Sequence, residues 1–167
     1  LPDLGVCTCV IGEVHIPYGS NTPAVCGRLI EDYGEHEGRV ECFGDPAGGA
    51  RHTSQTEGTD WVQIEDYLGR HFGGQLSVLR GRADPGQKAR VNAVTRRMET
   101  ADGAVHFQID PSCKETIEDF ESVKWLEGAA HQLDKTDKRR SHWSDAVAYY
   151  LHERYPAQEH YTVTEQM

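Results

Sequence analysis

The stretch Ser141-His142-Trp143-Ser144-Asp145-Ala146-Val147 is the most informative segment of this chain. His142 and Asp145 lie three residues apart in the first turn of a predicted helix, so their side chains share one helical face. The helix is expected to run from Ser141 to about Tyr155, where Pro156 ends it. A carboxylate in such a mostly apolar helix indicates either a functional role or an acid that offsets the positive helix N-terminus.

A second acidic residue lies far upstream, where a short apolar strand is expected to end. Asp45 follows the predicted strand Arg39–Gly44 and precedes Pro46. An acid at the end of a strand and an acid on a late helix can converge on divalent metal ions, as two-metal phosphodiester hydrolysis requires. The alternative for Asp45 is a turn or cap residue before the proline.

Strand-like and helix-like segments alternate along the rest of the chain. Strands are expected at 6–16, 39–44, 75–79 and 105–109, and helices from Asn21 to Gly34, from Thr59, at 88–98, from Pro111 to Gly128, and from Ser141. This alternation predicts an α/β fold. We expect one domain over residues 1–156 and a polar C-terminal tail over 157–167. Trp61, Phe107, Phe120 and Trp125 are expected in the core.

The charge balance is unusual for a protein that binds nucleic acid. The chain carries 17 Lys and Arg against 27 Asp and Glu, a net charge of −10, whereas DNA-binding domains are usually basic. Two basic clusters stand out: Lys88, Arg90, Arg96 and Arg97, then Lys135, Lys138, Arg139 and Arg140. Such clusters are either solvated faces or phosphate contacts, and the position of the second, just before Asp145, favours function.

Several classes of protein are not expected. The sequence contains no apolar run long enough for a membrane span and no secretory signal. It has no phosphate-binding loop of the Walker A type, so ATP hydrolysis is not expected. The five cysteines form no CxxC pair, and their apolar neighbours predict buried thiols in a reducing cytosol rather than a zinc site.

Five segments, in order, resemble the C-terminal nuclease domain of the large terminase subunit of tailed bacteriophages. They are Val10–Pro17 with Ser20-Asn21-Thr22, then Gly44-Asp45-Pro46-Ala47-Gly48 with Arg51–Ser54 and Thr59-Asp60-Trp61, then Arg90–Val94, Ile109–Lys114, and Asp134-Lys135 with Ser141–Ala146. The resemblance covers most of the chain. It implies an RNase H-like mixed sheet flanked by helices, and an endonuclease that cuts concatemeric viral DNA during genome packaging.

The resemblance also implies the residues of the site. Asp45 and Asp145 would hold Mg²⁺ or Mn²⁺ as a two-metal centre, and Arg51, Arg90 and Lys135 would contact phosphate. His142 would either orient a ligand or contact phosphate, or it would lie at the surface beside a capping Ser141.

One feature of the family is not matched. Its first catalytic aspartate lies on an earlier strand, which would precede Leu1, and Gly12 replaces the first acid of the pair that ends at Glu13. Asp3 is the nearest substitute in sequence, and Glu13 would either approach the metal site or lie exposed on its strand beside Val14. Three interpretations follow: a fragment, a strand supplied by another polypeptide, or a domain that lacks part of its catalytic centre.

The expected partners are double-stranded DNA, the terminase ATPase domain, the small terminase subunit and the portal, in the cytoplasm of an infected bacterium and away from any membrane. The rival functions are another RNase H-like nuclease such as a resolvase or transposase, and a catalytically incomplete module used only for docking.

Overall fold

The computed structural model describes residues 6–46, 58–81, 83–98, 100, 103–129, 132–137 and 139–156. The predictions for Asp3, Arg51, Lys138 and the tail 157–167 therefore lie outside the described residues.

Helices and strands alternate as the sequence predicts, and the α/β class is confirmed. The elements are β1 (Thr8–Val10), α1 (Thr22–Tyr33), β2 (Val40–Gly44), α2 (Asp60–Phe72), the 3₁₀ turn η2 (Gly73–Gln75), β3 (Leu76–Arg80), α3 (Gln87–Met98), β4 (Phe107–Ile109), α4 (Lys114–Ser122) and α5 (His142–Arg154). The helix predicted from Pro111 to Gly128 is shorter than expected at both ends. None of the helices described is both long and apolar enough to cross a bilayer.

The described strands form two small parallel sheets rather than the single mixed sheet that the sequence predicts. In one sheet β1 pairs with β4, with Thr8 opposite Phe107, and in the other β2 pairs with β3, with Val40 opposite Leu76. Each sheet has two strands, so within the described residues neither extends into the wider sheet that an RNase H-like fold requires.

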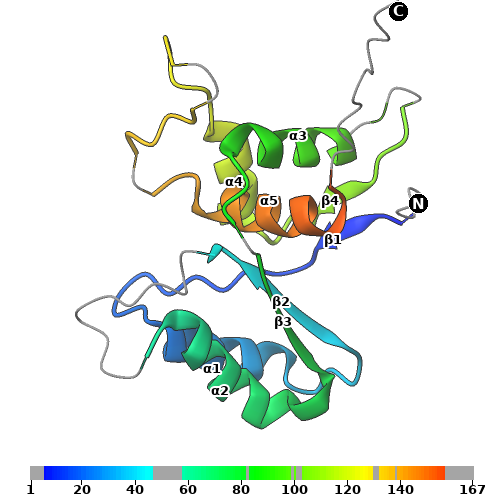
Figure 1. The fold of residues 1–167 in the computed structure, drawn as a ribbon, viewed down its shortest axis with the longest axis vertical. Coiled ribbons are helices and arrows are strands. Elements are labelled where there is room, and N and C mark those ends of the chain that lie inside the picture. The colour runs from blue at the N-terminus through cyan, green and yellow to red at the C-terminus, as the bar shows by residue number, and fades with distance from the viewer. Residues whose placement is uncertain are drawn as a thin grey trace, which may run out of the picture.

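Each sheet has its own hydrophobic core and its own helices (Figure 1). The core of the β1–β4 sheet includes Val94 of α3, Phe107 of β4 and Leu151 of α5, which is completely buried. The core of the β2–β3 sheet is formed by Cys26 of α1 with Leu68 and Phe72 of α2. The two halves meet where the ring of Phe43 on β2 contacts Tyr150 on α5 edge to face, with ring centroids 5.0 Å apart.

The predicted starts of the first two helices are confirmed. Asn21 adopts an extended conformation, and its side chain accepts a hydrogen bond of 2.9 Å from the backbone nitrogen of Ala24. Thr59 caps α2 in the same manner by accepting from the nitrogen of Val62. Such caps satisfy N–H groups that have no partner within the helix.

Glu13 explains why the strand predicted over 6–16 is wrong beyond Val10. Its carboxylate accepts hydrogen bonds from the backbone nitrogens of Glu115 and Thr116, at 3.1 and 2.9 Å, and from the Thr116 hydroxyl at 2.8 Å. Glu13 therefore caps the N-terminus of α4, and reaching that position takes the chain off the sheet. It is neither an exposed strand residue nor a lining residue of the cavity that holds Asp145.

Asp119 of α4 caps the next helix, α5, although it lies more than twenty residues before the start of that helix. Its carboxylate is completely buried and accepts hydrogen bonds from the backbone nitrogens of Ser141 at 2.6 Å and Ser144 at 2.8 Å. Ser141 has a φ of +69°, a left-handed conformation that costs a non-glycine residue about 1 kcal/mol. The two bonds offset this cost and fix the start of the helix that carries Asp145.

Three burial predictions are wrong. Trp125, expected in the core, is 43% exposed because it belongs to a short antiparallel bridge with Leu133 at the edge of the molecule. Cys7 and Cys9 are exposed, since β1 is only three residues long and the chain around it lies at the surface, whereas Cys26 and Cys113 are buried as predicted.

We predict that Asp119→Ala lowers the free energy of unfolding by about 3 kcal/mol, because it removes two hydrogen bonds from a buried helix end. Glu121→Ala, at an exposed position of the same helix, is the matched control and should change it by less than about 0.5 kcal/mol. Urea unfolding followed by circular dichroism measures both. Equal effects of the two variants would contradict a capping role for Asp119.

We also predict a pH dependence that originates at Glu13. Burial alone raises the pKa of Glu13, but the hydrogen bonds from Thr116 and Glu115 outweigh it and hold the pKa below its ordinary value of 4.5. A lowered folded-state pKa contributes stability that is present above pH 4.5 and is lost as the pH falls through the folded-state value. The thermal midpoint of wild type should therefore fall more than that of Glu13→Gln between pH 6 and pH 3.5. Parallel profiles would contradict the assignment.

Candidate metal and phosphate site

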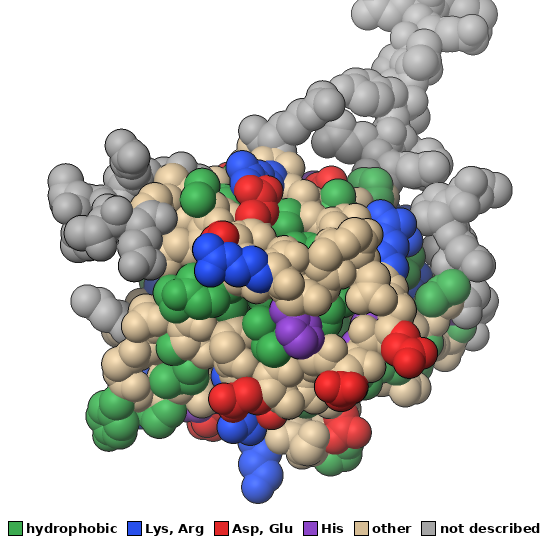
Figure 2. All heavy atoms as spheres, turned by 90° about the horizontal axis from the view of Figure 1, so that it is seen from below, with side chains coloured by type: hydrophobic (Ala, Val, Ile, Leu, Met, Phe, Trp, Pro, Cys, Tyr) green, Lys and Arg blue, Asp and Glu red, His purple; other side chains and the backbone are tan. Residues whose placement is uncertain are grey.

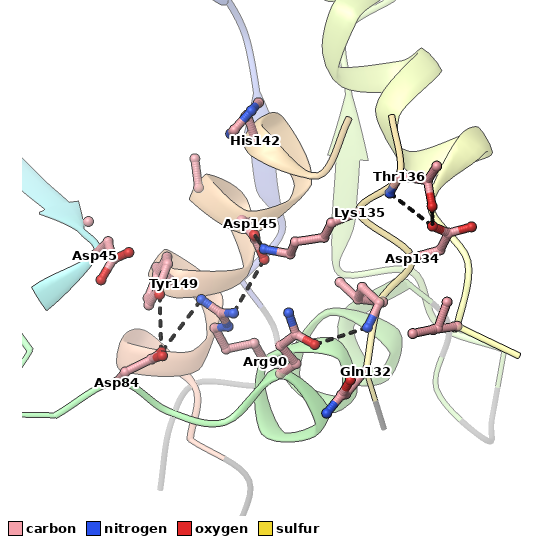
Figure 3. A pocket seen from close by; sticks show the side chains of 15 residues that line it. Asp45, Asp84, Arg90, Gln132, Asp134, Lys135, Thr136, His142, Asp145 and Tyr149 are labelled. Atoms are coloured by element: carbon pink, nitrogen blue, oxygen red, sulfur yellow. Dashed lines mark hydrogen bonds and ion pairs between the residues drawn. The ribbon is translucent and has the colours of Figure 1, made fainter. Parts of the chain in front are cut away.

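A cavity with a volume of about 1070 Å³ contains both predicted catalytic acids. Asp45 enters it from the end of β2, and Asp145 enters from the first turn of α5 (Figure 3). Two cationic side chains, Arg90 and Lys135, also line it. With His142, five of the six predicted site residues line this cavity. The sixth, Arg51, lies outside the described residues.

The position of Asp45 depends on a tryptophan beneath the end of β2. The indole nitrogen of Trp61, a buried residue at the start of α2, donates a hydrogen bond of 3.2 Å to the backbone oxygen of Asp45. The indole ring packs so closely on Gly44 that a Cβ there would lie 3.1 Å from a ring carbon. Gly44 therefore lets the indole ring approach the end of β2, and the hydrogen bond from Trp61 fixes the backbone of Asp45 beside the cavity.

Asp145 lies between two cations that come from different elements. Its Oδ2 accepts a hydrogen bond from Lys135 Nζ at 3.0 Å, and its Oδ1 lies 3.5 Å from Arg90 Nη2 (Figure 3). The Asp145 side chain is 19% exposed, so these contacts are shielded from bulk water more than a surface ion pair is. Both oxygens of the carboxylate therefore face positive charge.

Arg90 of α3 is a buried cation that the structure holds on three sides. Its guanidinium lies 3.7 Å from Asp84 and 3.5 Å from Asp145, and it stacks over the ring of Tyr149 at 4.1 Å. The residue is only 4% exposed. This combination of ion pairs and a cation–π contact makes Arg90 a fixed part of the wall rather than the solvated residue that a surface cluster would predict.

Asp84 and Tyr149 complete this wall, and neither was predicted from the sequence. The Tyr149 hydroxyl donates a hydrogen bond of 3.1 Å to Asp84 Oδ1. Burial raises the pKa of Tyr149, the charge of Arg90 opposes this effect, and the hydrogen bond to Asp84 and the charge of Asp45 reinforce it. Tyr149 lies one helical turn after Asp145, so this spacing was the signal that could have found it.

Lys135 is presented by a tightly turned loop. Asp134 Oδ1 accepts hydrogen bonds from the backbone nitrogen and the hydroxyl of Thr136, at 2.9 and 2.5 Å, and these bonds lower the pKa of Asp134. The loop is also fixed before Lys135, because the Leu133 nitrogen donates to Gln87 Oε1 at 2.9 Å. The Lys135 side chain is 50% exposed, in contrast to that of Arg90.

Of the other members of the two basic clusters that the structure describes, none lines this cavity. Arg97 is buried and stacks on Tyr155 at 3.9 Å, where it also donates to the backbone oxygen of His106. Arg139 pairs with Asp137 at 2.9 Å, and Arg140 pairs with Glu118. Their partners lie elsewhere, so among the described residues of the two clusters only Arg90 and Lys135 line the candidate site.

The donor chemistry of the cavity fits a hard divalent cation. Asp45, Asp84, Asp134 and Asp145 supply carboxylate oxygens, the ligands that Mg²⁺ and Mn²⁺ prefer. The four aspartates outnumber the two cationic side chains, so the wall attracts positive charge. Within the described ranges, no group of three or more His, Cys, Asp or Glu side chains is already gathered at metal-binding distance. Asp45 and Asp145 are the two of these carboxylates that the sequence predicts as metal ligands.

Comparison with known proteins adds no assignment. No protein family matches the sequence, and no curated protein or solved structure shows significant similarity to the chain.

We predict that Arg90→Lys lowers the free energy of unfolding by about 2 kcal/mol, because a lysine cannot both stack on Tyr149 and reach two carboxylates. Arg96→Lys makes the same exchange at an exposed position of α3 and should change it by less than about 0.5 kcal/mol. Chemical unfolding of both variants measures the difference, and a neutral Arg90→Lys would show that the guanidinium is not fixed in the wall.

Proposed function

We propose that this chain is a metal-dependent DNA endonuclease domain of the RNase H-like type, similar to the nuclease domain of phage packaging terminases. The observation that supports it is the convergence of Asp45 and Asp145 on one cavity, together with Arg90 and Lys135. These residues come from three separate regions of the chain, and all four were predicted from sequence motifs.

In this proposal each residue of the chain has a definite task. Asp45 and Asp145 hold the metal, and Arg90 keeps the Asp145 carboxylate oriented through its contact with Oδ1. Lys135, which is half exposed, contacts the phosphodiester, and His142 lies at the same wall, where it can contact a neighbouring phosphate. A bound Mg²⁺ or Mn²⁺ would activate the attacking water and stabilise the leaving 3′ oxygen.

The negative net charge of the molecule supports a DNA substrate that other proteins bring to the site, rather than one that the chain binds unaided. The net charge is −10, and acidic and basic side chains are interspersed on the face that carries α1 and α2 (Figure 2). A domain of this kind attracts DNA only locally and weakly. An ATPase motor, the small terminase subunit and the portal would bring double-stranded DNA to it. Phosphate contacts carry no base information, so cleavage would show little sequence preference.

The contacts of Asp145 also support a second candidate. Because both of its oxygens face cations, the same geometry suits a structural ion-pair network in a docking module that performs no hydrolysis. In the first function the carboxylates bind metal, and in the second they only form ion pairs. An assay of DNA cleavage separates the two.

We predict that the chain nicks supercoiled plasmid in Mn²⁺, and that Asp45→Asn and Asp145→Asn each reduce the rate by about a hundredfold or more. Asp66→Asn, on the exposed side of α2 where Asp66 pairs with Arg70, is the control and should retain full activity. Gel quantification of the nicked form gives the rates. Activity that survives both cavity substitutions would exclude the catalytic assignment, and an inactive wild type that still binds Mn²⁺ would favour the docking module.

A further inference from the structure

The two cations that contact Asp145 differ sharply in how firmly they are held. The Arg90 side chain is 5% exposed and is fixed by Asp84, Asp145 and the Tyr149 ring. The Lys135 side chain is 50% exposed and reaches Asp145 Oδ2 from a loop, with a single hydrogen bond of 3.0 Å. Asp145 is therefore paired on Oδ1 with a fixed charge and on Oδ2 with a displaceable one.

We propose that Lys135 and the divalent cation compete for Asp145 Oδ2, so that metal binding transfers the lysine ammonium from the carboxylate to the substrate phosphate. This inference rests on the proposed function, because it concerns the metal site of that function. It makes Lys135 a positioning residue whose partner depends on the loading of the site, and it sets an order in which metal binds before DNA.

Electrostatics gives the direction of the exchange. A divalent ion carries twice the charge of an ammonium and contacts a carboxylate oxygen at about 2.1 Å, compared with the hydrogen-bond distance of the lysine. The Lys135 side chain is half exposed, so its ammonium regains water when it leaves Asp145, and the displacement costs less than at a pair with two buried partners. Arg90 remains in place and continues to orient the carboxylate from the other oxygen.

The loop determines where the displaced ammonium goes. Asp134 and Thr136 are joined on either side of Lys135, and Leu133 is joined to Gln87, so the backbone of the loop stays at the cavity wall. The lysine stem can rotate about this fixed backbone, so the displaced ammonium can reach a phosphate bound in the cavity. In the metal-free protein this charge is neutralised by Asp145, whereas in the metal-loaded protein it becomes available to a phosphate oxygen.

The first test measures metal binding without turnover. Mn²⁺ is titrated into the 167-residue chain and the unbound ion is followed by electron paramagnetic resonance, for wild type, Lys135→Met and Lys124→Met. Lys124 is the matched control, since it pairs at 4.0 Å with Asp134, a carboxylate of the same cavity that Thr136 already holds, and not with Asp145. Lys135→Met should bind Mn²⁺ about threefold more tightly than wild type, because the competitor is gone. Lys124→Met should bind as wild type does.

The second test measures the transfer to phosphate. Affinity for a short DNA duplex is followed by fluorescence anisotropy over a range of salt concentrations, with no metal and with Ca²⁺, an oxygen-coordinated ion of the same charge. Ca²⁺ should steepen the salt dependence of wild type by about 0.9 in log–log slope, the value of one added phosphate contact. Lys135→Met should show no such steepening.

The outcomes separate this inference from the proposed function. An Asp145→Asn variant that binds Mn²⁺ as well as wild type, or a wild type that does not bind it, overturns both. Weakened binding in Asp145→Asn with unchanged binding in Lys135→Met leaves the proposed function standing and overturns the competition. An equal gain in Lys135→Met and Lys124→Met also overturns it, since a general charge effect would then explain the result.

Discussion

The buried carboxylate of Asp119 is the constraint on which the candidate site depends. It satisfies the N-terminal nitrogens of α5 and holds Ser141 in a left-handed conformation that a serine rarely adopts. Glu13 likewise accepts hydrogen bonds from N-terminal nitrogens of α4, the helix on which Asp119 lies. The orientation of Asp145 thus results from two successive helix caps, each supplied by a residue remote in sequence. Glu13 and Asp119, which form these caps, have no part in the proposed chemistry.

Local patterns in the sequence predicted the elements well. Asn21 and Thr59 are helix caps because a short polar side chain followed by helix-forming residues has few other roles, and the structure shows both. The motifs around Asp45, Arg90 and Asp145 led to residues that share one cavity. Such features depend on neighbouring residues, which a sequence records directly.

Long-range contacts account for what sequence reasoning missed. Asp119 reads as an ordinary acid on the face of α4, and nothing near it in sequence shows that it accepts from Ser141. Glu13 was expected on a strand because polar and apolar residues alternate around it. In the structure it caps α4, about a hundred residues later in the chain, by accepting from Thr116. The cluster that holds Arg90 and Arg97 reads as either a solvated face or a set of phosphate contacts. Only Tyr149 and Tyr155, which stack on the two guanidinium groups, explain their burial.

The presence of two cores has a consequence for communication within the molecule. Asp45 is attached to the β2–β3 core and Asp145 to the β1–β4 core, so neither core by itself determines how far apart the two carboxylates lie. That separation depends on the contacts between the two halves, which include the ring contact of Phe43 with Tyr150 and the ion pair of Glu41 with Arg154. A change in the packing of these two rings would therefore alter the distance between the two carboxylates without replacing any residue of the cavity.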